Sequence, residues 1–445
     1  MSSSTSSQAE TSGTSEARRV AFAGAVGTTI EWYDFFIYGT AAALVFGPQF
    51  FPQTSELAGT LASFATFAIG FAARPLGGIV LGHFGDRVGR KSMLVWSLML
   101  MGGSTFLIGV LPTYTQIGVW APILLVVLRC VQGFGLGGEW GGAVLMAVEH
   151  APERRRGLFG GFVALGLPTG IVLSNLVFLV VSGAASKAQF TDWAWRIPFL
   201  ASLLLVAIGL FVRLKVLETP LFARLVEKAA VVKVPVAEVI RRHPREIVLS
   251  AFLRMSEQAP FYLYTAFALT YIKNDLHKSQ YVGLLAVTVA AALELFLMPT
   301  FGQLSDRLGR RRVYGTGAVL MAVVAFPFFL LINTGTVGLI IAGVVLIAIP
   351  HAMQYGPQAS YIAENFPTGL AYAGSGLGYQ AASLIAGGPA PLLATWMLPN
   401  FGWQAISVYI IACAVLTLTA VALLPDRRGA DLAEAPLLTP VVSDR

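Results

Sequence analysis

Charged residues are scarce in this chain, and their scarcity indicates its class. Asp, Glu, Lys and Arg make up only 12% of the 445 residues, whereas 56% belong to the hydrophobic class. A soluble protein of this length carries a much larger share of charge on its surface. An α-helical membrane protein does not, because lipid is the solvent for most of its surface. The composition therefore predicts an all-α, polytopic membrane protein.

Cysteine is almost absent, as are the usual signs of an enzyme. The two cysteines, Cys130 and Cys413, lie in apolar segments, which argues against a disulfide framework and a metal site. The sequence has no GxxxxGK[ST] phosphate-binding loop, so an ATP-driven pump is not expected. The five histidines are scattered, and no spacing typical of nucleophilic or metal-dependent catalysis appears. We expect neither an enzyme nor a cofactor.

Long apolar runs dominate what is present. A helix that crosses a bilayer needs about 20 residues, and on this basis the sequence predicts twelve spans. They are 20–46, 57–81, 92–111, 119–147, 158–182, 193–213, 247–272, 280–301, 313–332, 337–361, 371–397 and 402–424. The Ser- and Thr-rich segment 1–17 is predicted to be a disordered tail.

The basic residues gather on one side of the predicted membrane. Of the 30 Lys and Arg residues, only Lys187, Lys273 and Lys278 fall in the loops of the opposite side. Four more lie in or beside spans, namely Arg74, Arg129, Arg196 and Arg254. This positive-inside pattern places both termini in the cytoplasm. The net charge of +7 is therefore explained by topology, and no nucleic-acid partner is expected.

The chain also repeats itself. GHFGDRVGRK (82–91) follows the second span and GQLSDRLGRR (302–311) follows the eighth. The repeat predicts two six-helix bundles, 18–213 and 247–424, joined by a cytoplasmic loop, 214–246, and followed by a tail, 425–445. Repeated halves are common in secondary transporters, which bind their solute near the midplane between the repeats.

The duplicated pattern G-x-x-x-D-R-x-G-R-[RK] resembles the signature of the major facilitator superfamily. Four stretches resemble its metabolite:proton symporter branch, whose members carry shikimate, 2-oxoglutarate, citrate, or proline and betaine. They are EWYDFFIYG (31–39), RCVQGFGLGGEWGGA (129–143), EQAPFYLYTAFALTY (257–271) and GLGYQAASLIAGGPAP (376–391). The resemblance covers about 18–425 and implies the major facilitator fold. The chain departs from it after span ten, where Gly369 and Ala371 stand in place of basic residues. A cationic partner for Glu364 in that loop is therefore not expected.

Two acids in the first span predict proton coupling. Asp34 lies near its middle, with Glu31 three residues earlier on nearly the same face. An ionised acid at the bilayer centre costs about 2.5–3.5 kcal/mol, so such residues are functional candidates. The resemblance implies that Asp34 pairs with Arg129 of span four and that its protonation breaks the pair. A fixed salt bridge between the two helices is the alternative for this pair. Glu31 is a candidate second proton site, or it bonds the indole of a neighbouring Trp. Glu139, further along span four, is a candidate proton relay or a pairing group for the gate.

Polar residues of spans seven and ten predict the solute site. Arg254 can donate two hydrogen bonds to a carboxylate, although Glu257, three residues on, can instead neutralise it. The other candidates are Gln258, Tyr262, His351, Gln354 and Tyr355, with Tyr264 beside them. Ordinary polar contacts between helices are the alternative for each. Glu294 of span eight has no partner that the sequence identifies.

The resemblance implies that the duplicated loops form a cytoplasmic gate. Asp86 and Asp306 are expected to accept helix N-terminal amides and to pair with arginines. The predicted gate residues are Gly82, Asp86, Arg87, Gly89, Arg90, Glu149, Arg156, Gly302, Asp306, Arg307, Gly309, Arg310 and Glu364.

These features predict a monomeric transporter of the bacterial cytoplasmic membrane that imports a small organic solute with protons. A carboxylic acid, shikimate-like or dicarboxylic, is the first solute class, because Arg254 can neutralise a carboxylate. A zwitterion such as proline or betaine is the alternative, because the aromatic residues around 261–271 suit a quaternary ammonium group. A drug:proton antiporter is disfavoured by the buried Arg129 and Arg254, and a nutrient sensor by the short loop and tails.

Overall fold

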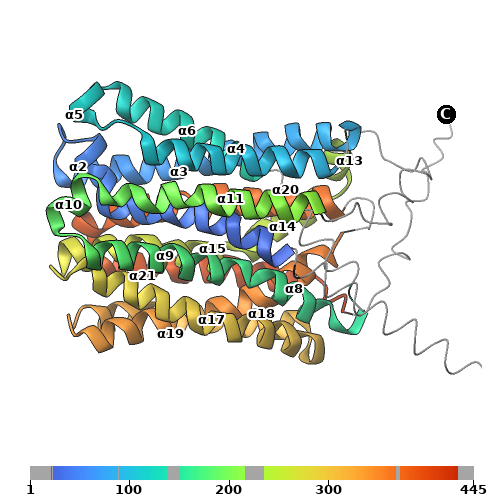
Figure 1. Cartoon of the computed structure of the whole chain (residues 1–445). Coiled ribbons are helices and arrows are strands. Elements are labelled where there is room, and N and C mark those ends of the chain that lie inside the picture. The colour runs from blue at the N-terminus through green and yellow to red at the C-terminus, as the bar shows by residue number, and fades with distance from the viewer. Residues whose placement is uncertain are drawn as a thin grey trace, which may run out of the picture.

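The computed structural model is a bundle of helices that run side by side between two ends (Figure 1). It describes residues 22, 24–88, 90–137, 151, 153–215, 235–366 and 371–428, without the side chains of 82–94, 153, 187, 212–237 and 371–373. We call the end that carries the α17–α18 turn and residues 424–428 the basic end, after Arg307, Arg310, Arg311 and Arg312. The opposite end is the far end.

The N-terminal half supplies six long helical stretches. The first runs from 24 to 41 and continues through η1 (Ala42–Phe46) and α2 (Gly47–Phe50). It is followed by α3 (Glu56–Val88), α4 (Arg90–Val110), α5 (Tyr114–Ile117), α6 (Trp120–Gly137), η2 (Glu153–Arg155), α8 (Arg156–Ala164), α9 (Gly166–Ala184), α10 (Lys187–Asp192), η3 (Ala194–Arg196) and α11 (Ile197–Lys215).

The C-terminal half repeats this plan. It comprises α13 (Pro235–Arg242), α14 (Pro244–Leu253), α15 (Met255–Tyr262), η4 (Leu263–Phe267), α16 (Ala268–Thr270), η5 (Tyr271–Asp275), α17 (Gln280–Leu308), α18 (Arg310–Ile332), α19 (Val337–Ala363), α20 (Ala371–Ala382), η6 (Ser383–Gly387) and α21 (Pro389–Leu423). The π-helical segments η1, η4, η5 and η6 interrupt helices of both halves. Such segments often mark functional positions.

The described helices agree with the twelve predicted spans, although 138–147 of the predicted fourth span lie outside the described residues. Eight stretches of the described chain are long and apolar enough to cross a membrane by length and composition. One of them, Gly374–Leu423, holds two predicted spans, because the backbone turns at Gly402 with φ 74°. Val95–Val110 is a shorter apolar helix. The first and seventh spans form the remaining helices, 24–50 and 244–275, and carry charged residues within them.

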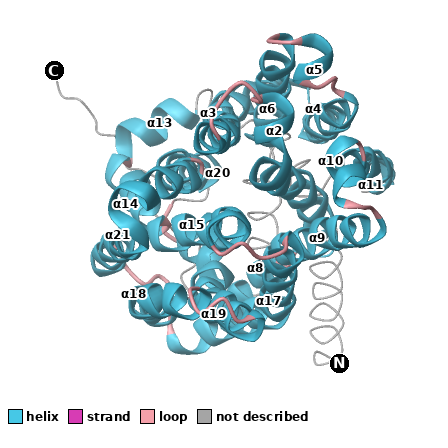
Figure 2. Cartoon of the chain, turned by 90° about the vertical axis from the view of Figure 1, so that its left-hand side faces the viewer, coloured by secondary structure: helices cyan, strands magenta, loops and turns pink. Residues whose placement is uncertain are grey.

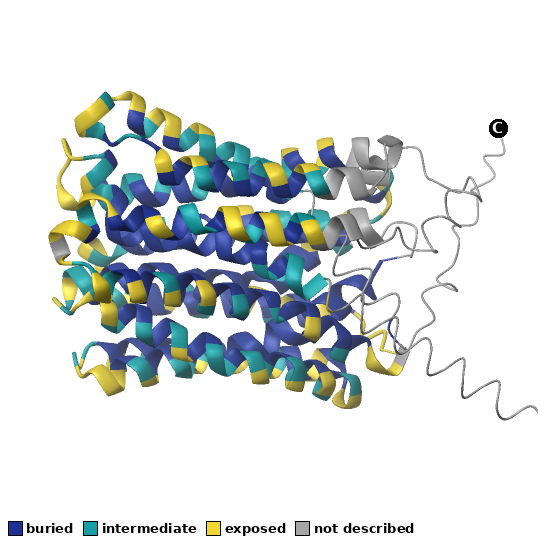
Figure 3. Ribbon diagram, in the orientation of Figure 1, coloured by how far each residue is buried: buried dark blue, intermediate teal, exposed yellow. Residues whose placement is uncertain are grey.

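The outer surface of the bundle is apolar. Between 39% and 61% of each spanning window is buried inside the protein, and large apolar side chains cover much of the rest. Phe296, Val180 and Leu204 are 74%, 68% and 67% exposed. Buried residues concentrate inside the bundle and exposed ones outside it (Figure 3). This surface suits contact with lipid tails. Cys130 and Cys413 are both free, as predicted.

The halves meet along helices that include α8, α9 and α17. Both α8 and α9 pack on α17, and α8 also packs on α19. Viewed from the far end, α9 lies beside α17, and α15 lies among the inner helices (Figure 2). A Cβ atom on Gly157 would lie 2.4 Å from the carbonyl oxygen of Gly302. The small residues let the two halves approach closely at the basic end.

Close contact between α3 and α6 leads to a prediction about stability. A Cβ atom on Gly133 would lie only 2.1 Å from the carbonyl oxygen of Gly70. We expect Gly133→Ala to force the two helices apart and to destabilise the fold by about 1–3 kcal/mol. A lower melting temperature of the purified protein in detergent would confirm this. Gly103→Ala is the control, because a Cβ atom there meets nothing within 4 Å; equal melting of both variants would contradict the prediction.

Candidate functional site

The acid of the first helix is sealed inside the N-terminal half. Asp34 is 0% exposed, and neither carboxylate oxygen has a hydrogen-bond partner within the described residues. The nearby Thr105 hydroxyl donates to the carbonyl oxygen of Met101 at 2.9 Å, so its only proton is already used. Within the described residues, the carboxyl group of Asp34 is therefore buried without a hydrogen-bond donor.

Arg129 lies in the same half, against aromatic rings. Its guanidinium carbon is 4.0 Å from the ring centroid of Tyr38 and 4.7 Å from that of Phe35. Its Nη1 atom donates to Oε1 of Gln132. A Cβ atom on Gly70 would lie 2.4 Å from its Nε atom, so only glycine leaves room for the guanidinium there.

The expected ion pair between Asp34 and Arg129 is absent in this conformation. Gln132 lies between them: its Nε2 atom donates to the backbone carbonyl of Asp34 at 3.3 Å and to the hydroxyl of Thr105 at 2.8 Å. The aromatic rings attract the guanidinium instead, which a cation–π contact explains. The two residues lie near each other, as predicted, but are bridged rather than paired.

Arg74 of α3 is a candidate that the sequence analysis did not select. It is 3% exposed, and its Nε and Nη2 atoms have no hydrogen-bond partner within the described residues. Its guanidinium carbon lies 4.3 Å from the ring centroid of Phe71. Glu31 of its own half and Tyr262 and Tyr379 of the other half act on it electrostatically. An arginine in the middle of an apolar span was a signal that could have identified it.

Glu31 and Asp34 do not share surroundings, although they are three residues apart. Glu31 is 4% exposed and acts electrostatically on Arg74 and on Tyr379 of the C-terminal half. Asp34 faces α4 of its own half, where a Cβ atom on Gly102 would lie 3.5 Å from its Oδ2 atom. Glu31 therefore belongs to the interface between the halves and Asp34 to the core of one half.

Arg254, the predicted carboxylate donor, is already occupied. Its Nε atom lies 3.4 Å from Oε2 of Glu257. Its Nη1 atom donates to the carbonyl oxygen of Tyr379 at 2.8 Å, and its Nη2 atom donates to Gln258. The self-neutralising i,i+3 pair is thus the arrangement observed, so Arg254 is not an open donor in this conformation.

The residues predicted on α19 separate into two groups. His351 stacks on Phe261 with ring centroids 4.7 Å apart and on Tyr355 at 5.5 Å. Gln354 instead accepts a hydrogen bond from Ser256 of α15, inside the C-terminal half. In this conformation Gln354 therefore joins α15 to α19, and the prediction that His351, Gln354 and Tyr355 face the solute stays a prediction.

Glu294, for which the sequence identified no partner, contacts two predicted residues. Its Oε1 atom lies 2.6 Å from Nδ1 of His351 and accepts the hydroxyl of Tyr264 at 2.9 Å. All three side chains are buried. The structure therefore brings together titratable groups from α17, α19 and η4.

Aromatic rings from both halves surround the region of Arg74. The Tyr262 ring centroid lies 5.3 Å from that of Phe71 and 5.8 Å from that of Phe35. Trp32 and Phe261 form a similar contact at 6.2 Å. The hydroxyl of Tyr262 and Nε1 of Trp32 have no hydrogen-bond partner within the described residues. These donors and rings could contact a small molecule that has both polar and apolar parts.

At the basic end, Asp306 joins the two halves. Its carboxylate accepts the backbone N–H groups of Gly157 and Leu158, the first residues of α8 after Arg156, at 2.9 Å each. Arg310 contacts the same carboxylate at 2.7 Å. The expected contact between Asp306 and helix N-terminal amides is therefore present.

Glu364 has a cationic partner, but not in the loop after α19. Its carboxylate accepts two hydrogen bonds from Arg310, at 3.0 and 3.3 Å. Arg310 is the arginine that follows the second glycine of the repeated motif, and it is placed at the start of α18 because Gly309 turns the chain with φ 103°. Arg310 therefore fills the role left by the missing basic residues at Gly369 and Ala371.

Several predicted gate and relay residues cannot be placed. Gly89, Glu139 and Glu149 lie outside the described residues, as do the side chains of 82–94 and thus Gly82, Asp86, Arg87 and Arg90. Arg156 is buried at the start of α8. Arg307 contributes its carbonyl oxygen, which accepts from Arg428. Gly302 allows the close approach of Gly157.

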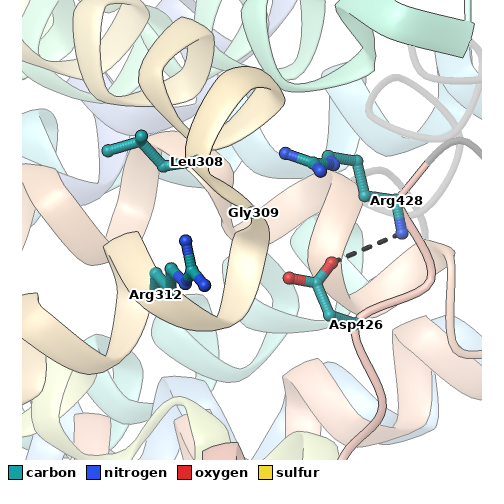
Figure 4. A pocket seen from close by; sticks show the side chains of 5 residues that line it. All are labelled: Leu308, Gly309, Arg312, Asp426 and Arg428. Carbon is teal, nitrogen blue, oxygen red and sulfur yellow. Dashed lines mark hydrogen bonds between the residues drawn. The ribbon is translucent and has the colours of Figure 1, made fainter.

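A surface pocket of about 320 Å³ lies at the α17–α18 turn, lined by Leu308, Gly309, Arg312, Asp426 and Arg428. Arg312 faces Asp426 and Arg428 across it, and Asp426 accepts the backbone N–H of Arg428 at 3.3 Å (Figure 4). Asp426 also accepts the backbone N–H of Arg311 at 3.2 Å. All of these residues belong to the C-terminal half or to the tail that follows it, so the pocket is not a site between the halves.

The far end is also closed by contacts between the halves. Lys273 donates to the carbonyl oxygen of Leu44 in η1 at 2.9 Å, and Thr270 donates to that of Ala43 at 3.4 Å. A cavity of only about 10 Å³ is lined by Thr28, Gly160, Val163, Ala164, Tyr355, Gln358 and Ala359. That is about the room that one water needs. Contacts between the halves are therefore present at both ends of the described interface.

Comparisons with known proteins agree with this architecture. A family model described as "Sugar (and other) transporter" matches residues 20–233, and one described as "Major Facilitator Superfamily" matches residues 248–440. The chain is 41% identical to the shikimate transporter of Escherichia coli K12 over 421 residues, covering 93% of this chain and 96% of that protein.

Two further matches are more distant. The chain is 34% identical to the proline/betaine transporter of Escherichia coli K12 over 438 residues, which cover 96% of this chain and 86% of that protein. Its fold is similar to that of the proton:xylose symporter XylE bound to 6-bromo-6-deoxy-D-glucose. The TM-score is 0.72 at 18% identity, covering 95% of this chain and 98% of that one. At this identity the likeness shows the fold alone.

Proposed function

This chain belongs to the major facilitator superfamily and, within it, to the metabolite:proton symporter family, and we propose that it imports a small carboxylic acid with protons. It is a membrane transporter, not an enzyme. We place its basic end in the cytoplasm of a bacterial cell, following the positive-inside rule.

The observation that carries the proposed solute class is the open guanidinium of Arg74. A buried charge normally has a partner, because an unpaired one is costly. Arg74 is buried between the halves, with two nitrogen atoms that have no hydrogen-bond partner within the described residues. A carboxylate can accept two parallel hydrogen bonds from one guanidinium. The role first predicted for Arg254 thus passes to Arg74.

A shikimate-like acid also suits the remaining groups of the interface. The hydroxyl of Tyr262 and Nε1 of Trp32 supply donors for ring hydroxyls, and the Phe71 ring supplies an apolar wall. The relative that transports shikimate is 41% identical. These points together favour an oxygen-rich acid.

A zwitterion such as proline or betaine is the second candidate, because Glu31 lies beside Arg74. The carboxylate of a zwitterion would contact Arg74, while Glu31 and the Trp32 and Phe261 rings would contact its ammonium group. The proline/betaine relative is 34% identical. Two buried arginines, Arg74 and Arg254, act against a cation and favour the acid.

Alternating access follows from contacts at the two ends. The Asp306 contacts would close the cytoplasmic end, and the Lys273 and Thr270 contacts would close the opposite end. With both sets made, the solute site is occluded. Breaking one set at a time exposes the site to one side of the membrane, which is the motion proposed for repeated-half carriers.

Uptake into proteoliposomes tests the proposed function. Protein would be reconstituted with an inward proton gradient and supplied with radiolabelled shikimate, 2-oxoglutarate, benzoate, proline or betaine. We expect accumulation of an acid, and its loss when a protonophore removes the gradient. Accumulation of proline or betaine alone would favour the zwitterion. Absence of gradient-dependent uptake for the whole panel would overturn the proposal.

Asp306→Asn should slow transport while leaving solute affinity nearly unchanged. The substitution removes a charge that accepts two helix N-terminal amides and pairs with Arg310, so the closed cytoplasmic end loses stability. The solute site lies elsewhere and keeps its contacts. Initial uptake rates and the dissociation constant of purified protein would be measured together.

Asp426→Asn is the matched control for the gate. Asp426 lies at the same end and accepts backbone N–H groups, but only from Arg311 and Arg428 of its own half. It should leave the uptake rate close to that of the wild type. A large loss of solute affinity in Asp306→Asn would exclude the gate assignment.

A further inference from the structure

The C-terminal half contains a buried cluster of ionisable groups to which the solute contacts and the gate proposed above assign no role, although Arg254, Glu257 and His351 were predicted as solute-site residues. We call Glu294, His351, Glu257 and Arg254 the α17–α19 cluster. Glu257 is 2% exposed, and the other three members are 0% exposed. Burial of this kind requires that the charges balance.

The charges of the cluster balance only if it holds an additional proton. Arg254 and Glu257 form an ion pair at 3.4 Å and cancel. Glu294 then remains as a carboxylate beside His351, and a neutral imidazole leaves one negative charge buried. One more proton, on Glu294 or on the imidazole, makes the cluster neutral.

The cluster has open positions for that proton. Oε2 of Glu294 and Nε2 of His351 are both buried without a hydrogen-bond partner within the described residues. Oε1 of Glu294 and Nδ1 of His351 already face each other at 2.6 Å. The Nε2 atom points toward Glu257, whose Oε1 atom lies 4.0 Å away. His351 therefore lies between the two acids.

Within the described residues, no Lys or Arg side chain forms an ion pair or hydrogen bond with Glu294 or His351. The titratable groups that face the cluster are Tyr262 of α15, Tyr264 of η4, Tyr314 of α18, Tyr355 of α19 and Tyr379 of α20. All five are neutral phenols at physiological pH. The α9 helix packs along α17 and contains no titratable residue. Arg74 lies across the interface and acts on Arg254, which Glu257 already neutralises.

We propose that the α17–α19 cluster is a second proton-binding site, so that the occluded carrier holds one proton there and one on Asp34. The proposal rests on the proposed proton-coupled transport. It adds that two protons move with each solute, one in each half. His351 connects Glu294 to Glu257, and thus to Arg254 at the interface.

Glu294→Gln is the direct test in transport. Glutamine keeps an acceptor for Tyr264 and His351 but no longer requires the extra proton. With the membrane potential clamped at zero, each coupled proton supports about a tenfold accumulation per pH unit. The accumulation ratio should fall about tenfold at a gradient of one pH unit. An unchanged ratio would overturn the proposal.

Tyr264→Phe is the matched control. It removes the hydroxyl that donates to Glu294 but leaves both ionisable partners of the 2.6 Å contact. The accumulation ratio should stay at the wild-type value, even if the rate changes. A fall equal to that of Glu294→Gln would show that packing, not proton binding, is responsible, and would also overturn the proposal.

A measurement without solute separates this proposal from the proposed function. The unfolded chain binds no proton at these two residues between about pH 7 and 9, whereas the folded cluster retains one. Wild-type stability should therefore fall with rising pH relative to Glu294→Gln. Melting temperatures of detergent-purified proteins would show diverging curves. Parallel curves would overturn the second proton site even if no solute of the panel were transported.

Discussion

Arg74→Gln is expected to weaken binding of the carboxylate solute by roughly 30-fold to a few thousand-fold. Removing one partner of a buried, hydrogen-bonded charge pair costs about 2–5 kcal/mol, which corresponds to that range. Arg254 is a weaker candidate, because it is held by Glu257, Gln258 and the carbonyl oxygen of Tyr379. Titration of purified protein with the solute identified by uptake would measure the loss.

Two further variants serve as comparisons for the binding measurement on Arg74→Gln. Arg74→Lys keeps the charge but not the two-pronged donor, so its affinity should fall between those of the wild type and Arg74→Gln. Arg312→Gln removes an arginine that lines only the surface pocket at the cytoplasmic end, and should bind normally. Wild-type affinity in Arg74→Gln would exclude Arg74 as the carboxylate donor and return attention to Arg254.

Asp34→Asn should remove one of the two coupled protons. Asp34 is fully buried and has no cation or hydrogen-bond donor at its carboxylate within the described residues. Its neutral form is therefore favoured in the occluded state, and asparagine imitates that form. At a gradient of one pH unit, the accumulation ratio of the solute should fall about tenfold, while exchange of solute across the membrane continues. The double variant Asp34→Asn, Glu294→Gln should equilibrate the solute across the membrane without accumulating it.

Glu31→Gln distinguishes the two acids of the first helix. Glu31 acts on Arg74 and Tyr379 at the interface, so its substitution should change solute affinity but leave the number of coupled protons unaltered. If Glu31→Gln lowers the accumulation ratio and Asp34→Asn does not, Glu31 is the coupling acid. Full accumulation in both variants would place the N-terminal proton elsewhere, with Glu139 of the predicted fourth span as the next candidate.

Helix packing explains why the sequence analysis found the right region of the site but the wrong donor. Arg254 and Glu257 were recognised as an i,i+3 pair, and such a pair can close on itself or open to a ligand. The choice depends on neighbours from α20 and on Gln258, which the spacing does not reveal. Arg74 was visible as a charge within a span, but its open nitrogen atoms appear only once its surroundings are known.

Glu294 and Glu364 illustrate the same limit. Glu294 contacts His351, 57 residues away in sequence, and Glu364 pairs with Arg310, 54 residues away. Both contacts join different helices. Many spans are apolar around most of their circumference, so the 3.6-residue period does not show which side faces the protein. The sequence therefore does not determine how each helix is rotated about its axis, nor which residue each buried acid contacts.

The sequence by itself determined that this protein is a twelve-helix membrane transporter built from two related halves. This conclusion follows from the low charge, the apolar runs of span length and the duplicated motif. A bilayer permits few architectures, and each has a recognisable sequence pattern. The tertiary structure alone decided that Gln132 separates Asp34 from Arg129, that Arg74 remains open, and that Glu294 meets His351. These arrangements depend on how helices that are distant in sequence rotate and pack against one another. Each one is determined by charged groups and aromatic rings that come into contact only in the folded protein.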